Sequence, residues 1–136
     1  MDHLSIATRI TGSALYAQSV RMKVASENLA NAESTGHSPG ADPYARKLIT
    51  FDTDSGQKSG SLVRVRSIDV DSKPFRVELR PGHPAADEKG FVKLPNVDTI
   101  IEIADLKEAG RSYQANLQTM RQIRELVSMT LDLLKG

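Results

Sequence analysis

The sequence contains no cysteine and no tryptophan, and aromatic residues make up only 4% of its 136 residues. Without cysteine the chain cannot form disulfides, thiolate metal sites or a cysteine nucleophile, so these structures and reactions are excluded. With only three phenylalanines and three tyrosines, large rings cannot dominate a core or an interface. A stable core must therefore be built mainly from aliphatic side chains and methionine.

An excess of one charge and long apolar runs are also lacking. The 18 Lys and Arg residues nearly balance the 17 Asp and Glu residues, so the whole chain has no electrostatic preference for nucleic acid. No uninterrupted apolar run reaches the roughly 18 residues of a transmembrane helix. Residues 1–5 lack the features of a cleaved secretory signal, so we expect any export to use another route. A hydrophobic content of 39% and a charged content of 26% are typical of one globular domain.

Residues 4–31 are predicted to form one long helix, because they contain no proline and their apolar residues recur at helical spacing. Asp2 or Ser5 can cap its start. The apolar face is broad, which suggests more than one packing partner. Its two adjacent rows consist of Ile6, Ile10, Ala14, Ala17 and Val24, and of Leu15, Met22 and Leu29.

Residues 35–95 have a different character. Short alternating or β-branched runs at 48–51, 62–66 and 75–79 predict half-exposed strands. Polar, glycine-containing loops such as residues 54–61 separate them. We interpret this segment as a small, irregular β module with a thin core.

Residues 96–134 are predicted to form a second long helix, capped by a Thr99–Glu102 capping box or by Asn96. Its apolar residues alternate at spacings of three and four, as in a coiled coil. A buried Asn116 would fix the register of such a helix at a cost in stability. This apolar seam consists of Leu106, Ala109, Tyr113, Asn116, Met120, Ile123, Val127, Thr130 and Leu134.

The expected fold is therefore α+β, with two long terminal helices forming a coiled-coil-like pair and a small irregular β module between them. The three segments are an N-terminal helix (1–34), a middle module (35–95) and a C-terminal helix (96–136). Apolar surface left over on long terminal helices points to contacts with other subunits. The simpler alternative is a self-contained helical hairpin packed on the β module.

Signals for catalysis or metal binding are weak. The three histidines, His3, His37 and His83, are far apart, and no pair has metal-ligand spacing on one element. Asp52 and Asp54 begin like a calcium loop or an aspartic-protease turn, but the flanking residues do not continue either pattern. We therefore predict no catalytic residues, no metal, no cofactor and no small-molecule substrate, and a hydrolase built on these two aspartates is a distant alternative.

Two motifs and a third, shorter run carry a resemblance to a known family. Residues 26–36 (SENLANAESTG) resemble the Asn-(Leu/Ile)-Ala-Asn-x-x-Thr-x-Gly signature of the flagellar rod and hook family. Residues 81–97 (PGHPAADEKGFVKLPNV) are similar to a segment specific to its proximal-rod members. Residues 109–116 (AGRSYQAN) are similar to the family's Ala-x-Arg-x-Tyr-x-x-Asn run. The motif-loop residues are Pro81, Gly82, His83, Pro84, Asp87, Gly90, Pro95 and Asn96.

The resemblance implies a non-enzymatic subunit of the bacterial flagellar basal-body rod, in the periplasm-spanning part. Such subunits pass unfolded through the flagellar type III export apparatus and polymerise helically with copies of themselves and with other rod proteins. Their terminal helices line the export channel, and the assembly transmits torque. The subunit interface expected on this basis comprises Ile6, Ile10, Leu15, Met22, Asn28, Leu29, Asn31, Gly36, Leu106, Tyr113, Asn116, Met120, Ile123, Val127 and Leu134.

Two alternatives to a proximal-rod subunit stay open at this level. One is a different rod component, since other family members share the first motif. The other is a peripheral membrane or adaptor protein, because Arg9, Arg21 and Lys23 make the first helix basic as well as amphipathic.

Overall fold

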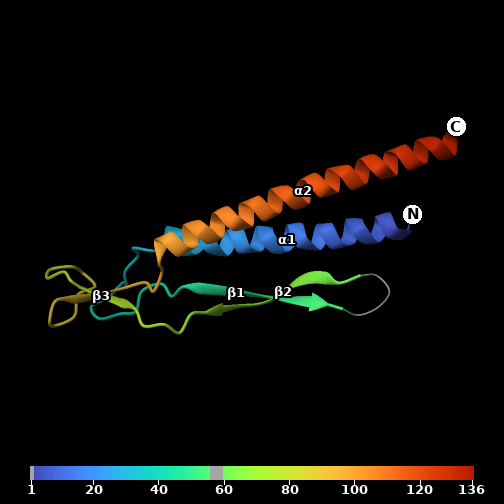
Figure 1. Ribbon diagram of the computed structural model, residues 1–136. Coiled ribbons are helices and arrows are strands. Elements are labelled where there is room, and N and C mark those ends of the chain that lie inside the picture. Colours follow the sequence, from blue (N-terminus) through green and yellow to red (C-terminus); the bar gives the residue numbers. More distant parts are fainter. Residues whose placement is uncertain (1, 56–59) are drawn as a thin grey trace. The chain divides into compact units, whose positions relative to one another are not determined.

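The computed structural model describes residues 2–55 and 60–136, and Figure 1 shows their helices and strands. Two long helices flank four strands in sequence, which confirms the expected α+β class. The helices are α1 (Asp2–Ala30) and α2 (Thr99–Lys135). The strands are β1 (Lys47–Asp54), β2 (Leu62–Val70), β3 (Arg76–Leu79) and β4 (Phe91–Leu94).

The strands form two separate two-stranded sheets, β1 with β2 and β3 with β4. In the second sheet the strands are antiparallel, with Leu79 opposite Phe91 and Arg76 opposite Leu94. The three predicted strands correspond to β1, β2 and β3, but β4 lies in a segment interpreted as loop. The predicted loop at 54–61 lies partly outside the described residues, because 56–59 are not among them.

The chain divides into two compact units that do not follow the order of the sequence. Unit 1 contains residues 1–22, 50–67 and 107–136, and unit 2 contains residues 23–49 and 68–106. Each unit therefore takes residues from the N-terminal helix, the middle module and the C-terminal helix.

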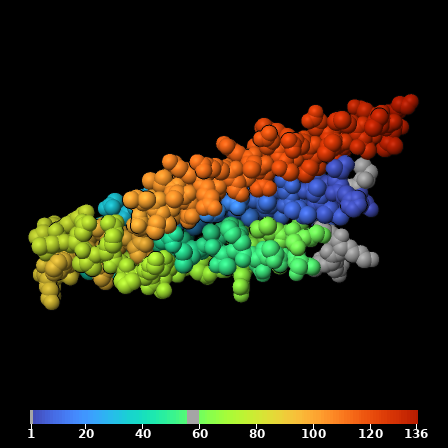
Figure 2. All heavy atoms as spheres, viewed as in Figure 1, coloured from blue at the N-terminus to red at the C-terminus, as the bar shows by residue number. Residues whose placement is uncertain are grey.

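In unit 1, α1 lies between α2 and the β1–β2 sheet, as the space-filling view in Figure 2 also shows. A Cβ at Gly12 would lie 3.8 Å from the Met120 side chain of α2, and the Ser13 hydroxyl accepts a hydrogen bond from the Val63 amide of β2 at 3.2 Å. The helices are antiparallel, since the earlier Gly12 meets Met120 while the later Arg21 pairs with Glu108 at 3.3 Å. The buried hydrophobic residues of this unit are Ala17, Ala109, Met120 and Ile123.

Unit 2 has its own small core, built around the β3–β4 sheet. The inward face of β4 supplies Val92 and Leu94, which are fully buried. Strand β4 was not predicted from the sequence because it has only four residues. Its two core residues, Val92 and Leu94, are the only sign of the alternation that marks a strand. The remaining buried hydrophobic residues are Val24, Ala25, Ala32, Ala85 and Val97.

The start of α2 is capped by Asp98, and the predicted caps at Thr99 and Asn96 are wrong. The Asp98 carboxylate accepts a hydrogen bond from the Ile100 amide at 3.0 Å, and its carbonyl accepts one from Glu102 at 3.1 Å. Asp98 therefore satisfies helix-terminal amides in the manner of an N-cap. Asn96 and Glu102 have other partners.

Candidate functional site

The apolar seam of α2 faces its own chain over most of its length. Ala109, Met120 and Ile123 are buried, whereas Leu134 is exposed. The other members, Leu106, Tyr113, Asn116, Val127 and Thr130, are half-buried, as are the predicted α1 interface residues Ile6, Ile10, Leu15, Met22 and Leu29. Both sets therefore bury part of their surface without a second subunit.

The broad apolar face of α1 is covered from two sides inside the chain, by α2 and by the β1–β2 sheet. A helix whose apolar face is covered cannot lay that face on a lipid surface. Within the described residues, neither helix combines the length and the hydropathy needed to cross a bilayer. The packing of α1 against α2 and the β1–β2 sheet therefore disfavours the peripheral-membrane alternative.

The C-terminal part of α2 presents apolar residues to solvent. Leu133 is 82% exposed, and Leu126, Met129, Leu131 and Leu134 are also exposed. Five large apolar side chains within nine residues form an uncovered surface of the kind that marks a protein–protein contact. We call these residues the α2 end patch.

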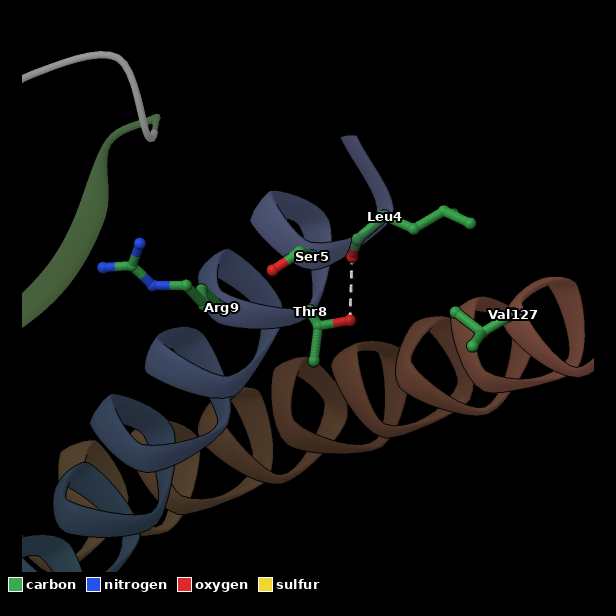
Figure 3. A pocket seen from close by; sticks show the side chains of 5 residues that line it. All are labelled: Leu4, Ser5, Thr8, Arg9 and Val127. Carbon is green, nitrogen blue, oxygen red and sulfur yellow. Dashed lines mark hydrogen bonds between the residues drawn. The ribbon is translucent and has the colours of Figure 1, made fainter. Parts of the chain in front are cut away.

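A shallow hollow lies between the N-terminal part of α1 and the C-terminal part of α2 (Figure 3). Its volume is about 270 Å³, and it is lined by Leu4, Ser5, Thr8, Arg9 and Val127. The Thr8 hydroxyl donates a hydrogen bond to the Leu4 carbonyl at 2.8 Å, so its proton is already paired within α1. Its chemistry suits an apolar side chain better than a charged ligand.

Unit 2 contains a polar cluster that the sequence did not reveal as a whole: the buried Asn28, Asp71 and Glu102 and the half-buried Arg46 and Asn96. Asn28, in the last turn of α1, is only 1% exposed. Its amide group donates to the Lys47 carbonyl at 2.9 Å and to Glu102 at 3.3 Å. Its oxygen accepts from the Lys47 amide at 2.9 Å and from the Tyr44 hydroxyl at 2.7 Å. These bonds use the full hydrogen-bonding capacity of an asparagine side chain.

Glu102 is the buried acid of this polar cluster, 1% exposed in the first turns of α2. One carboxylate oxygen forms an ion pair with the Nε of Arg46, and the other accepts the bond from Asn28. Burial lowers the pKa of the Arg46 guanidinium, but hydrogen bonds and charges, those of Glu102 above all, outweigh burial and raise it. From the sequence, Glu102 was expected in the Thr99–Glu102 capping box. In the structure it joins α2 to α1 and to the segment before β1.

Asn96 holds the same segment from another side. Its oxygen accepts a hydrogen bond from the Arg46 amide at 2.8 Å, and its nitrogen donates to the carbonyls of Asp71 and Lys73. Arg46 also pairs with the Asp71 carboxylate at 3.3 Å. The backbone amide of Lys73 lowers the pKa of Asp71, and Arg46 lowers it further. Asn28 and Asn96, which belong to different motifs, thus converge on consecutive residues of one segment.

Asn116 does not have the register-fixing role predicted for it. It is half-buried, and its amide donates to the Ser112 carbonyl of its own helix at 2.8 Å. Glu102 lies two heptads earlier at the same heptad position. The prediction of a buried polar residue therefore had the correct heptad position, but the buried residue is Glu102 and not Asn116.

The segment that follows the first motif contacts the second motif within unit 2. The Gly40 amide, just beyond the first motif, donates to the Ala85 carbonyl in the second at 3.1 Å. A Cβ at Gly36 would lie 2.6 Å from the Ala41 carbonyl oxygen, so Gly36 is required by close backbone approach. Asn31 directly follows α1, and its side-chain amide donates to the Glu27 carbonyl at 2.8 Å.

The motif loop between β3 and β4 is a compact double turn. Gly82 and Gly90 have positive φ angles of 84° and 85°, which glycine adopts without strain. His83 accepts a hydrogen bond from the Ala85 amide at 3.0 Å, and Asp87 accepts two, from Lys89 and Phe91. Pro81, Pro84 and Asp87 are exposed, and Pro95 is buried beside the polar cluster.

The aspartates considered for hydrolysis have ordinary partners. Asp54 pairs with Arg64 at 3.7 Å, and Asp52 accepts a hydrogen bond from the Thr53 amide at 2.8 Å. Both carboxylates lie in β1 rather than at the end of a cleft. Their arrangement offers no paired acid and base.

Arg46, Tyr44 and Asp71 were not predicted as site residues, although the polar cluster depends on them. They lie in or next to a stretch that has no recognisable sequence motif. From the sequence alone, a single arginine before a strand cannot be told apart from an arginine that is exposed to solvent. A hint was available, because Glu102 falls in phase with the apolar seam, one step before Leu106.

Comparisons with known proteins identify a family. The family described as "Flagella basal body rod protein" matches residues 9–37, and that described as "Flagellar basal body rod FlgEFG protein C-terminal" matches residues 88–133. A flagellar basal-body rod protein FlgC from Agrobacterium fabrum is 54% identical, covering 100% of this chain and 99% of its own length. The FlgC of Salmonella typhimurium is 43% identical over 91% and 92%, and that of Borreliella burgdorferi is 33% identical over 93% and 95%.

Proposed function

Because the chain belongs to the family of flagellar basal-body rod proteins FlgC, we propose that it assembles into the proximal rod through its antiparallel helix pair. It is a structural, non-enzymatic subunit of the flagellar basal-body rod. The similarity to FlgC over the full length of both chains carries this conclusion. We further propose that the chain polymerises helically with copies of itself and with other rod proteins, encloses the export channel and transmits torque.

The α2 end patch supports a contact with other rod subunits. Leu126, Met129 and Leu133 are exposed although they are large apolar side chains. Burying such side chains against a neighbour would be favourable at roughly 25 cal/mol per Å² of apolar surface. The seam residues Met120 and Ile123 are already buried inside the chain, so within the seam it is the end, at Leu134, that is left exposed for assembly. Passage through the type III export apparatus is part of the same proposal and rests on family membership alone.

Complementation of an in-frame deletion tests the proposal, with motility and electron microscopy of basal bodies as readouts. We expect the deletion strain to lack hook and filament while keeping the membrane ring, and the wild-type gene to restore both. Leu133→Asp should fail to restore them, because it places a charge in the α2 end patch. Gln122→Asp, which adds the same charge at an exposed polar position of α2, is the matched control and should restore them.

The purified Leu133→Asp protein should keep the wild-type helical content and unfolding midpoint, since Leu133 is 82% exposed in the isolated chain. Normal rods built from Leu133→Asp would refute the α2 end patch as an assembly surface. Normal flagella in the deletion strain itself would refute the rod function.

A further inference from the structure

The apolar contacts between α1 and α2 do not by themselves define how the helices align. Along α2, Leu106, Tyr113, Met120 and Val127 repeat every seven residues. Along α1, the rows repeat with the same period, as in Leu15, Met22 and Leu29. A displacement of α2 by one heptad, about 10.5 Å along the helix axis, would bring apolar residues opposite apolar residues again.

Glu102 breaks this degeneracy. It continues the seam toward the start of α2 and is the only charged residue in that row. In the observed arrangement its carboxylate bonds both Arg46 and Asn28. After a displacement of one heptad, Ala109 would face Asn28 in place of Glu102. Arg46 and Asn28 would then lose the carboxylate in a buried site, which is strongly unfavourable.

We propose that Glu102 and Arg46, oriented by Asn28, are positioning residues that fix the register of α2 against α1. A single buried polar residue that sets register is the best-attested use of polar groups inside helix pairs. Asn28 is suited to orienting the acid, because its other three hydrogen bonds hold it to Tyr44 and to both backbone groups of Lys47. The Arg46 backbone is fixed in turn by Asn96.

The proposal concerns the chain's own helices and does not depend on rod assembly. Its consequence for assembly rests on the proposed function: a register error of one heptad would displace the α2 end patch by about 10.5 Å along α2. A subunit with the wrong register would present its apolar side chains at the wrong place.

Cysteine crosslinking can read the register directly, because the chain has no cysteine of its own. Gly12 tolerates a side chain, since an added Cβ would meet only the Met120 methyl at 3.8 Å. The pair Gly12→Cys with Met120→Cys reports the observed register. The pair Gly12→Cys with Val127→Cys reports the register displaced by one heptad. Each pair is made in the wild-type background and in an Arg46→Met/Glu102→Leu background, and is treated with a short bismaleimide under dilute conditions.

In the wild-type background we expect efficient crosslinking of the 12–120 pair and little of the 12–127 pair. In the Arg46→Met/Glu102→Leu background we expect the 12–120 product to fall and the 12–127 product to rise to a comparable amount. The double substitution should still fold, because replacing a buried ion pair by apolar residues is usually tolerated. Circular dichroism and urea unfolding check this for every variant.

A purely stabilising role predicts a different result. In that case the double variant, once folded, would keep the wild-type crosslinking pattern, and this outcome would overturn the proposal. If the double variant fails to fold, the single substitution Glu102→Gln decides instead. Glu102→Gln keeps the size of the side chain and can still bond Asn28. The positioning role is supported if the wild-type crosslinking pattern survives in Glu102→Gln but is lost in Glu102→Leu. A wild-type pattern in both single variants overturns it.

Discussion

Replacing Arg46 by methionine should destabilise the protein more than any exposed ion pair could. The substitution keeps most of the aliphatic volume of the side chain but removes the guanidinium that pairs with Glu102 and Asp71. Glu102 is 1% exposed and would keep only the hydrogen bond from Asn28. A carboxylate in that position can neither be hydrated nor be neutralised by another cation of the polar cluster.

The magnitude follows from burial. Removing one partner of a buried ion pair typically costs about 3–5 kcal/mol, because the remaining charge is left uncompensated. Asp71 adds little to this loss, since the Lys73 amide still bonds its carboxylate at 2.9 Å. We therefore expect a loss of about 4 kcal/mol, a large part of the 5–15 kcal/mol that is typical of folded domains. Glu102→Leu should cost less, because Arg46 is partly exposed and retains Asp71.

Urea unfolding of the purified chain, followed by far-UV circular dichroism, measures these differences. Arg46→Met, Glu102→Leu and the double variant form a double-mutant cycle, and the double variant should be more stable than Arg46→Met alone. A loss below about 1 kcal/mol for Arg46→Met, the value of an exposed pair, would refute the reasoning. It would mean that Glu102 gains water or another partner when Arg46 is removed.

Two further predictions concern a carboxylate in unit 2 and a pair of glycines, one in unit 2 and one in α2. Asp71→Asn should lower the free energy of unfolding at neutral pH. Because the pKa of Asp71 is lowered on folding, the difference in stability from wild type should shrink as pH falls below about 4. Unfolding midpoints measured across this pH range test the prediction, and a stability difference that does not depend on pH contradicts it. Gly36→Ala should destabilise by about 1–3 kcal/mol, because the new Cβ meets the Ala41 backbone. Gly110→Ala, whose Cβ meets nothing within 4 Å in the middle of α2, should stabilise by about 1 kcal/mol. Thermal unfolding of the Gly36→Ala and Gly110→Ala proteins compares the two changes in stability. Equal changes would refute the distinction between a crowded and an open glycine.

Features that repeat along the chain could be predicted from the sequence. The two helices follow from apolar periodicity sustained over four or more heptads, and their observed bounds differ from the expected ones by no more than three residues. Three of the four strands follow from alternation. The family resemblance rested on motif residues whose order in the chain is enough for identification.

Features that depend on contacts between distant residues could not be predicted. Arg46 bonds Asn96 and Glu102, which are 50 and 56 positions away in the sequence. No local sequence pattern predicts contacts at such separations. Asp98 caps α2 although Thr99 and Glu102 have the spacing of a capping box, because burial of Glu102 against Arg46 removes it from that role. Asn28 carries no local sign of its contacts either, although its side-chain amide bonds both backbone groups of Lys47 at the start of β1.

The interleaved composition of the two units has a consequence for folding kinetics. Unit 2 joins residues of α1 to residues of α2, as in the bond from Asn28 to Glu102 across 74 positions. Unit 1 likewise needs residues 107–136 beside residues 1–22. Contact order is therefore high, and loop closure must precede most of the stabilising contacts. Unit 1 takes residues from both ends of the chain, so a fragment that lacks either end does not contain all of unit 1. A chain delivered from one end to the other therefore completes unit 1 only when nearly its last residues arrive.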